Sequence, residues 1–289
     1  GFKVYAFDQD NKRIKNLINL KNYVYENNLD KLIKKNINKK LIFNNNLANL
    51  NKCEVVFISE DIPTDSNGKS NLKNIKNNIN KVIKLLNKNT TLVILSQIPP
   101  GFTRKILWPS RQLYYQVETL IFGQAIFRAL YPERIIVGMD KSKNLIEKKY
   151  RYYLNAFNSP IIKMNYESAE VSKISINIFL ISTVLTTNLL SSLCEKLGAN
   201  WQDIIPALKL DKRIGNYAYT EPGLGLSGGN LERDLHTFKL LSRKYKIKDK
   251  IINSYLSNSN RSKLWVYNKL KDLILKNRKK YKITILGLT

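Results

Sequence analysis

The sequence predicts an α/β protein in which a doubly wound parallel sheet domain precedes an all-helical domain built on one long helix. In residues 1–157, short apolar runs alternate with helical segments, as in sheets that helices cover on both faces. Residues 166–198 then form one long apolar stretch with no proline and no glycine before its last residue. These two patterns place the expected domains at residues 1–157 and 158–279.

Each element of the first domain is expected where apolar residues recur with the period of a strand or a helix. The strands are expected at residues 3–7, 41–43, 54–59, 91–96 and 134–138. The helices are expected at residues 12–20, 72–86 and 141–157. Ligands of such folds bind at the carboxyl ends of parallel strands, so the expected binding edge comprises Asp8 and residues 59–64 and 96–103.

Asp8 is the first candidate binding residue, because an acid that closes a strand of a dinucleotide-binding sheet accepts a hydrogen bond from a ribose hydroxyl. An aspartate after a strand is also a common turn residue, and the sequence leaves both interpretations open. Arg13 follows one helical turn later, within reach of a phosphate or an adenine ring. The other candidates for this edge follow the later strands and are Pro63, Thr64, Ser96 and Gln97.

The long helix is expected to begin after Asn165, a suitable N-cap, with Glu167 and Glu170 near the positive end of its dipole. It is apolar nearly all round and is therefore expected to be buried between other elements. Lys173 and Asn177 interrupt the apolar body four residues apart, so they share one face. A lysine in this position either extends to solvent from a core helix or has a functional partner.

The chain has 49 Lys and Arg residues against 22 Asp and Glu residues, a net charge of +27. The lysines are dispersed and accompany many Asn and Ile residues, so we expect no nucleic-acid-binding surface. The two cysteines lie in apolar surroundings, which suggests a reducing, cytoplasmic compartment, and the residue types offer no credible transition-metal site. Ser, Thr and Asn recur in residues 166–198, so we expect a buried helix and no membrane span.

The chain begins without an initiator Met inside an expected strand and closes with an apolar run, YKITILGLT. We therefore expect a fragment of a longer protein. The glycine-rich loop GxGxxG of a dinucleotide-binding domain is expected before residue 1. Residues 280–289 are expected to be the first strand of a further C-terminal domain.

Six motifs occur in order along the chain: IPTDSNGKSNL, SQIPPGFTRKI, VETLIFGQAIFRALYPERIIVG, SAEVSKISIN, DKRIG and PGLGLSGGNLERD. Each is weak alone, but their order and spacing are specific, and together they resemble the UDP-glucose/GDP-mannose dehydrogenase family over almost the whole chain. The resemblance implies a Rossmann-like NAD-binding domain, a central helical domain and a C-terminal nucleotide-sugar domain. It also implies oxidation of a sugar CH2OH group by two hydride transfers to NAD.

The resemblance assigns catalytic roles to four residues of this sequence. The family's lysine and asparagine on the long helix match Lys173 and Asn177, its aspartate matches Asp234, and the first glutamate of its P-E-F-L-x-E motif matches Glu118. Ammonium and amide groups on one helix face can stabilise the oxyanion that forms as an alcohol loses hydride, and a carboxylate can act as general base.

The positions implied to contact the substrate are Thr119, Leu120, Arg213, Gly225 and Gly228. Three of these residues, Arg213, Gly225 and Gly228, have a simpler alternative. Arg213 is equally well explained as a solvated charge, and a glycine-rich run such as residues 223–229 is often only a flexible loop.

The sequence departs from the family at three positions close to the chemistry. The catalytic cysteine of the loop G-x-G-F-G-G-S-C-x-x-K-D, which traps the aldehyde as a thiohemiacetal, falls on Asn230. The second glutamate of P-E-F-L-x-E falls on Phe122, and the threonine of S-T-x-P-P-G falls on Gln97. An amide is not a nucleophile as a thiolate is, so we expect one hydride transfer per turnover and a carbonyl product.

The leading function is therefore an NAD-dependent nucleotide-sugar dehydrogenase of polysaccharide or surface-glycan biosynthesis, assembled as a homodimer through the outer face of the long helix. Three alternatives stay open at this point. A β-hydroxyacid or 6-phosphogluconate type dehydrogenase also carries a Lys-x-x-x-Asn pair on a long helix, although the apolar run at 280–289 argues against it. The others are a non-catalytic homologue that binds nucleotide sugar and a basic nucleic-acid binder.

Overall fold

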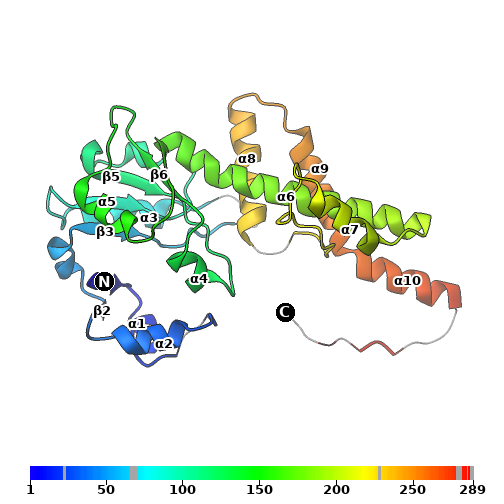
Figure 1. Cartoon of the computed structure of the whole chain (residues 1–289), viewed down its shortest axis with the longest axis horizontal. Helices are drawn as coiled ribbons and strands as arrows, with labels where there is room; N and C mark the ends of the chain where they lie inside the picture. The colour runs from blue at the N-terminus through cyan, green and yellow to red at the C-terminus, as the bar shows by residue number, and fades with distance from the viewer. Residues whose placement is uncertain (22–23, 66–69, 227–228, 278–281, 285, 287–289) are drawn as a thin grey trace. The chain divides into compact units, whose positions relative to one another are not determined.

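The computed structural model describes the chain except for residues 22–23, 66–69, 227–228, 278–281, 285 and 287–289. Contacts between residues divide the chain into two compact units, and most of the elements are labelled in Figure 1. Unit 1 comprises Gly1–Pro63 and Ser70–Lys173, and unit 2 comprises Thr64–Lys69 and Ile174–Thr289. The division falls inside the long helix α6 (Tyr166–Leu197), which therefore belongs to both units.

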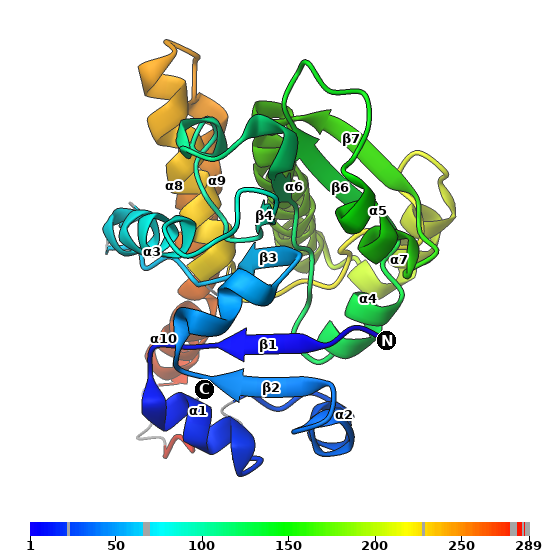
Figure 2. The same cartoon turned by 90° about the vertical axis from the view of Figure 1, so that its left-hand side faces the viewer.

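Unit 1 contains two sheets (Figure 2). In the first, β1 (Val4–Phe7) pairs in parallel with β2 (Leu41–Asn44), and Val4 lies opposite Leu41. The second sheet has the order β3-β4-β5-β6-β7. Its strands are β3 (Val55–Ile58), β4 (Thr91–Ile94), β5 (Leu113–Gln116), β6 (Ile135–Met139) and β7 (Ile161–Asn165).

The predicted α/β class and all five predicted strands are confirmed, and β5 and β7 are additional strands that we did not predict. All pairs in the two sheets are parallel except that of β5 with β6. Because the chain direction reverses there, the carboxyl ends of β6 and β7 lie at the opposite edge from those of β3, β4 and β5.

The helices of unit 1 are short, and all but one of them bury apolar residues on one face. They are α1 (Asn11–Ile18), α2 (Leu29–Asn36), α3 (Lys73–Ile83), α4 (Ala125–Leu130) and α5 (Lys148–Asn155). Short 3-10 turns occur at Leu47–Lys52, Thr103–Lys105 and Ser110–Gln112.

The prediction of a helix over residues 141–157 is wrong in its first half. The Asp140 carboxylate accepts a hydrogen bond of 3.0 Å from the N–H of Ser142 and closes a turn there. The Glu147 carboxylate then accepts one of 2.7 Å from the N–H of Lys149 and caps α5. The helix therefore begins only at Lys148.

The first turn of α6 packs directly on the second sheet. The Tyr166 hydroxyl donates to the carbonyl of Leu113 at 2.9 Å. A Cβ on Gly138 of β6 would lie 2.7 Å from the Cβ of Ala169, so glycine is needed where helix and strand approach this closely. The sheet's own core is formed by Val93, Tyr114, Ile135, Val137, Met139, Ile146, Tyr150 and Leu154.

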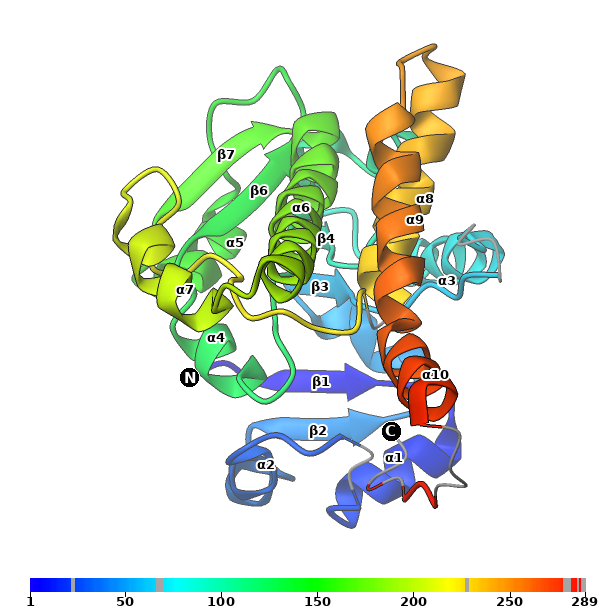
Figure 3. The ribbon, with the colours of Figure 1, turned by 90° about the vertical axis from the view of Figure 1, so that its right-hand side faces the viewer.

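Unit 2 is helical in the residues that the structure describes (Figure 3). Besides α6 it contains α7 (Trp201–Leu210), α8 (Gly229–Lys244), α9 (Lys250–Lys263) and α10 (Trp265–Asn277). The predicted bounds of the long helix are confirmed to within one residue, and Asn165 caps it by accepting from the N–H of Ser168 at 2.8 Å. The core of this unit is formed by Ile181, Leu185, Leu226, Leu235 and Ile252.

Within the described chain, α6 is only partly buried between other elements. Only 33% of its most apolar window is buried, and Phe179 and Leu197 are 76% and 72% exposed. Residues of α8 and α9 pack on one side of it, which leaves an apolar face uncovered in the described structure. By length and composition α6 could cross a membrane, a criterion that core helices of soluble proteins also meet.

The expected strand at residues 280–289 is only partly described. Residues 282–284 and Leu286 belong to no helix or strand, and the other residues of this run lie outside the described part of the chain.

Candidate functional site

The structure brings the predicted residues Asp8 and Arg13 together at the carboxyl end of β1. Arg13 Nη1 donates to Asp8 Oδ2 at 2.8 Å, while the N–H of Asp10 donates to Asp8 Oδ1 at 2.8 Å. Asp10 in turn caps α1 by accepting from the N–H of Lys12 at 2.8 Å. Asp8 is therefore a turn residue, and its partly exposed carboxylate is also oriented by a guanidinium.

A chain of polar side chains joins the carboxyl ends of β1, β3 and β4. Gln9 Nε2 donates to Asn78 Oδ1 at 2.8 Å, and Asn78 Nδ2 donates to Glu60 Oε2 at 2.6 Å. The hydroxyl of Ser96 is buried and donates to the carbonyl of Glu60 at 2.7 Å. In this structure Ser96 therefore fixes the strand ends, together with Gln9 and Asn78, which the sequence did not single out.

The other predicted cofactor residues differ in their exposure. Pro63 is exposed, and its carbonyl accepts from the N–H of Asn71 at 2.8 Å. Gln97 is half-buried directly after Ser96. Thr64 is exposed and belongs to unit 2.

Glu170 holds the loop after β4, a role that sequence reasoning missed. Its carboxylate is fully buried and accepts from the N–H groups of Gly101 at 2.5 Å and Thr103 at 2.8 Å. Burial raises the pKa of Glu170, whereas the two N–H groups favour its ionised form. The sequence suggested only a dipole interaction for this residue, because its partners are backbone groups of a distant loop.

An ion-pair cluster fixes the start of α6. Arg104 bonds to both carboxylate oxygens of Glu167 and donates to Asp140 Oδ2 at 3.2 Å. Its guanidinium also lies 5.4 Å from the centre of the Tyr166 ring. The hydrogen bonds from Arg104 lower the pKa of Glu167 to about 2.

Lys173 and Glu118, both predicted to be catalytic, meet at the carboxyl end of β5. Lys173 Nζ donates to the backbone carbonyl of Glu118 at 2.7 Å. The Glu118 carboxylate accepts from the N–H of Leu120, and the carbonyl of Thr119 accepts from Arg128 Nε at 3.0 Å. The ammonium thus reaches the edge of the sheet at which β3 and β4 also end, so it does not simply extend into solvent.

In unit 2, Asn177 and Asp234 form a buried pair. Asn177 Nδ2 donates to Asp234 Oδ2 at 2.5 Å, and both side chains are almost fully enclosed. Asn230, at the position implied for the nucleophile, accepts from Arg233 Nη2 at 2.8 Å through Oδ1. Its amide is thereby oriented as a hydrogen-bond acceptor beside a buried arginine.

The glycine-rich run is fixed against two helices. The N–H of Gly223 donates to Asn188 Oδ1 of α6 at 2.7 Å, and that of Leu226 donates to Ser259 Oγ of α9 at 2.9 Å. Gly225 has a φ of +88°, and a Cβ there would lie 2.5 Å from the carbonyl oxygen of Ser259. Glycine is therefore required by both conformation and space. Gly228 lies outside the described residues.

Arg213 is exposed and bonds to a carboxylate two residues before it. Its Nη2 donates to Asp211 Oδ2 at 2.6 Å, and the same pairing lowers the pKa of Asp211. In the described part of the chain, these hydrogen bonds join Arg213 to Asp211 and not to another element. Cys194 is buried beside Trp201 and Ile205, in agreement with the apolar surroundings expected for it.

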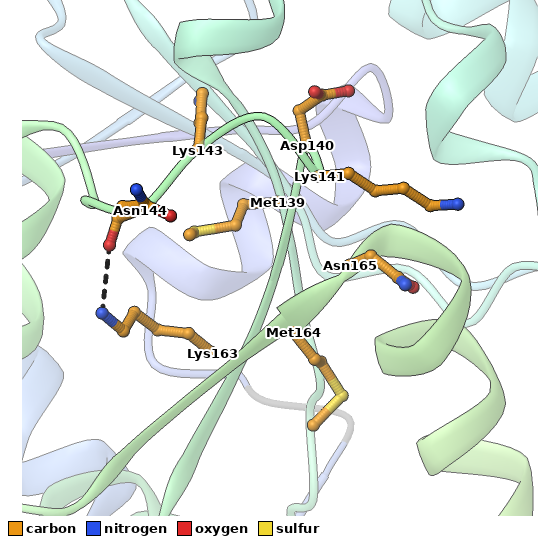
Figure 4. A pocket seen from close by; sticks show the side chains of 8 residues that line it. All are labelled: Met139, Asp140, Lys141, Lys143, Asn144, Lys163, Met164 and Asn165. Atoms are coloured by element: carbon orange, nitrogen blue, oxygen red, sulfur yellow. Dashed lines mark hydrogen bonds between the residues drawn. The ribbon is translucent and has the colours of Figure 1, made fainter.

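A pocket of about 360 Å³ lies at the opposite edge of the sheet (Figure 4). It is lined by Met139, Asp140, Lys141, Lys143, Asn144, Lys163, Met164 and Asn165. Figure 4 shows that its lysines point in different directions, so they do not converge on one ligand. Burial lowers the pKa of Lys143 to about 8, and its ammonium lies 4.3 Å from the centre of the Tyr114 ring. The pocket contains none of the predicted site residues.

Among the described residues, no group of three or more His, Cys, Asp and Glu side chains could hold a metal ion.

Two family models match the chain. The model of the UDP-glucose/GDP-mannose dehydrogenase family, NAD binding domain, matches residues 1–155, and that of the central domain of the same family matches residues 167–261.

Individual nucleotide-sugar dehydrogenases are similar to the chain over all or nearly all of its length. A UDP-glucose 6-dehydrogenase from Rickettsia typhi is 30% identical over 305 residues, covering 100% of this chain and 68% of that protein. A solved UDP-glucose dehydrogenase structure from Pyrobaculum islandicum has a TM-score of 0.80 at 20% identity, covering 96% of this chain and 66% of that one. A UDP-D-ManNAc dehydrogenase from Pyrococcus horikoshii gives the same TM-score, identity and share of this chain, and 67% of its own length is covered. The chain thus spans about two thirds of the length of these proteins.

Proposed function

Because the chain belongs to the UDP-glucose/GDP-mannose dehydrogenase family, we propose that it is part of an NAD-dependent oxidoreductase that acts on a CH–OH group of a nucleotide sugar. The β-hydroxyacid dehydrogenase alternative is not favoured, because the matched models and relatives are nucleotide-sugar dehydrogenases. The proposed setting is polysaccharide or surface-glycan biosynthesis in the cytoplasm, with no nucleic-acid or membrane partner.

The observation that most supports this proposal is that hydrogen bonds hold the candidate catalytic side chains in defined orientations. Lys173 is directed to the carboxyl end of β5, and Asn177 is paired with the buried Asp234. A hydrogen bond to a buried carboxylate gives the Asn177 amide a fixed orientation. Lys173, Asn177 and Asp234 are thus held in place by hydrogen bonds, although Asn230 stands at the position of the nucleophile.

The proposed cofactor site uses the carboxyl edge of the sheet. Asp8 at the end of β1 presents a carboxylate that Arg13 orients, which suits acceptance of hydrogen bonds from an adenosine ribose. Its negative charge repels a 2′-phosphate, so we expect NAD to bind more tightly than NADP. When bound at this site, NAD would supply the acceptor for the hydride that leaves the sugar carbon. Pro63, Thr64, Ser96 and Gln97 remain proposed neighbours of this site.

Each catalytic residue is proposed to act on the alcohol group. The Lys173 ammonium, which donates to the carbonyl of Glu118, is proposed to stabilise the developing oxyanion. Asn177 is proposed to donate to the same oxygen. Asp234 or Glu118 takes the alcohol proton, directly or through a water.

The proposed product is a carbonyl compound formed by one hydride transfer. Asn230 offers hydrogen bonds but no thiolate, so an aldehyde or ketone is held only non-covalently. Phe122 is strongly exposed and supplies no carboxylate for activating a hydrolytic water. The remaining candidates for substrate contact are Thr119, Leu120, Arg213, Gly225 and Gly228.

The test is the molar ratio of NADH formed to sugar consumed by the full-length protein, with UDP-glucose, UDP-ManNAc and GDP-mannose as substrates. We expect a ratio of one and a carbonyl product identified by mass. Lys173→Ala should abolish turnover and Asn230→Ala should reduce it only partly, whereas Lys163→Ala on β7 is the matched control. A ratio of two with a uronic acid product would refute the one-step mechanism, and NADH binding without any turnover would support the non-catalytic alternative.

We also propose that the exposed apolar face of α6 forms a two-fold homodimer interface. Four large apolar residues of the helix are at least half exposed: Phe179, Leu189, Leu193 and Leu197. An uncovered face of this kind is typical of association sites. Sedimentation of the full-length protein as a monomer at micromolar concentration would contradict this.

A further inference from the structure

Glu26, between α1 and α2, holds a segment of chain that lies almost a hundred residues further on. Its Oε1 accepts from the N–H of Gly123 at 2.7 Å, and its Oε2 accepts from the N–H of Ala125 at 3.1 Å. The residue as a whole is only 8% exposed. Both oxygens of a buried carboxylate are thus used by two backbone donors of one segment.

That segment, residues 118–125, is attached at both of its ends. At the first end Lys173 bonds to the carbonyl of Glu118 at 2.7 Å, and Arg128 bonds to that of Thr119 at 3.0 Å. At the other end the attachment is Glu26. Between the two ends, the chain exposes three apolar residues: Leu120, Ile121 and Phe122.

Packing contributes little to holding this segment in place. The helix that follows it, α4, has no buried residue, and the residue at its N-cap, Gln124, makes no side-chain capping bond. Glu26 instead accepts from the N–H of Ala125, the first residue of the helix, and from that of Gly123, whose φ is +80°. A free first-turn N–H is a position where a carboxylate is stabilising. The order of the segment therefore depends on polar attachments more than on burial.

We propose that Glu26 is a positioning residue for substrate binding: by clamping Gly123 and Ala125 it sets the path of residues 118–122, which present Glu118, Thr119 and Leu120. This inference rests on the proposed function, because it assigns the held segment to the nucleotide sugar. It predicts that loss of the clamp weakens sugar binding while cofactor binding at Asp8 is retained.

The experiment compares Glu26→Gln with wild type in the full-length protein. Glutamine has the same shape but only one acceptor oxygen, and its NH2 group would face a backbone donor. Glu54→Gln is the matched control, since Glu54 is an exposed carboxylate of the same unit whose partner is Lys149. Hydrogen exchange of peptides covering residues 118–128 reports the clamp, the KM for UDP-glucose reports positioning, and the Kd for NADH reports the cofactor site.

For Glu26→Gln we expect amide exchange in residues 118–128 to accelerate about tenfold and KM to rise about tenfold, with the Kd for NADH changed less than about twofold. Glu54→Gln should change none of these. Unchanged exchange would overturn the clamp, and faster exchange with an unchanged KM would reduce Glu26 to a structural role and overturn the proposal. Wild-type protein that neither binds NADH nor turns over a nucleotide sugar would refute the proposed function. Hydrogen exchange of the Glu26→Gln protein would then still show whether Glu26 holds Gly123 and Ala125 in place.

Discussion

Replacement of Gly225 by alanine should destabilise the helical unit, because two separate costs arise at this residue. A φ of +88° costs an L-residue about 1–2 kcal/mol relative to glycine. The new Cβ would also lie 2.5 Å from the carbonyl oxygen of Ser259 and 3.1 Å from its Oγ. Ser259 lies inside α9 and is buried, so its backbone has little room to move, and such overpacking costs about 1–3 kcal/mol. We therefore expect a loss of about 2–5 kcal/mol.

Thermal unfolding of the full-length protein, followed by tryptophan fluorescence, measures this loss. Trp201 is a suitable reporter, because its indole is buried in unit 2 and donates to the carbonyl of Thr220 at 2.9 Å. At about 2 °C per kcal/mol for a protein of this size, the midpoint should fall by about 4–10 °C.

Gly223→Ala is the internal control for this prediction. A Cβ at Gly223 meets no atom within 4 Å, and the N–H that bonds to Asn188 is kept. Its midpoint should stay within about 1 °C of wild type, because no clash and no positive φ are involved. A Gly225→Ala protein as stable as wild type would show that the loop does not contact α9 in this way. Equal losses in both variants would attribute the effect to general loop stiffening.

Two further predictions concern charged groups of unit 1. Because burial lowers the pKa of Lys143 from 10.5 to about 8, its charged form opposes folding. Lys143→Met should therefore raise the free energy of unfolding at pH 7 by about 1–3 kcal/mol, a gain that fades as pH rises from about 8 to 10.5, as urea unfolding at several pH values would show. The Glu167 carboxylate has its pKa lowered from 4.5 to about 2 by Arg104, so its stabilisation is complete above 4.5 and lost as pH falls to about 2. The difference in unfolding midpoint between wild type and Glu167→Gln should accordingly vanish near pH 2, and a constant difference would exclude the ion pair as its cause.

The sequence was sufficient for elements whose stability is mainly local. The long helix could be bounded to one residue, because its cap Asn165 and its closing Gly198 are local signals. β5 and β7 could not be predicted in the same way. Their sequences, LYYQ and IIKMN, are short and without clear alternation, and they are strands because β4 and β6 provide partners.

The same distinction between local and distant interactions applies to the candidate site. The shared helix face of Lys173 and Asn177 follows from a spacing of four residues, which a sequence displays directly. The roles of Glu26 and Glu170 do not, because the partners of both carboxylates are backbone N–H groups of distant segments. A backbone donor is present at nearly every residue and carries no mark in the sequence.

The buried carboxylates bear on how far this chain tolerates substitution. The chain has 22 acidic residues against 49 basic ones, so few acidic residues remain that lysine could replace. Glu26, Glu170 and Asp234 are buried and bonded to N–H groups of other segments, so lysine at any of them would place a cation against donors without an acceptor. Exposed acids such as Glu54 can change at the cost of little more than a surface ion pair. In a saturation mutagenesis library, tolerance at acidic positions should therefore follow burial closely, and the intolerant acids would mark the segments that the fold joins across long sequence distances.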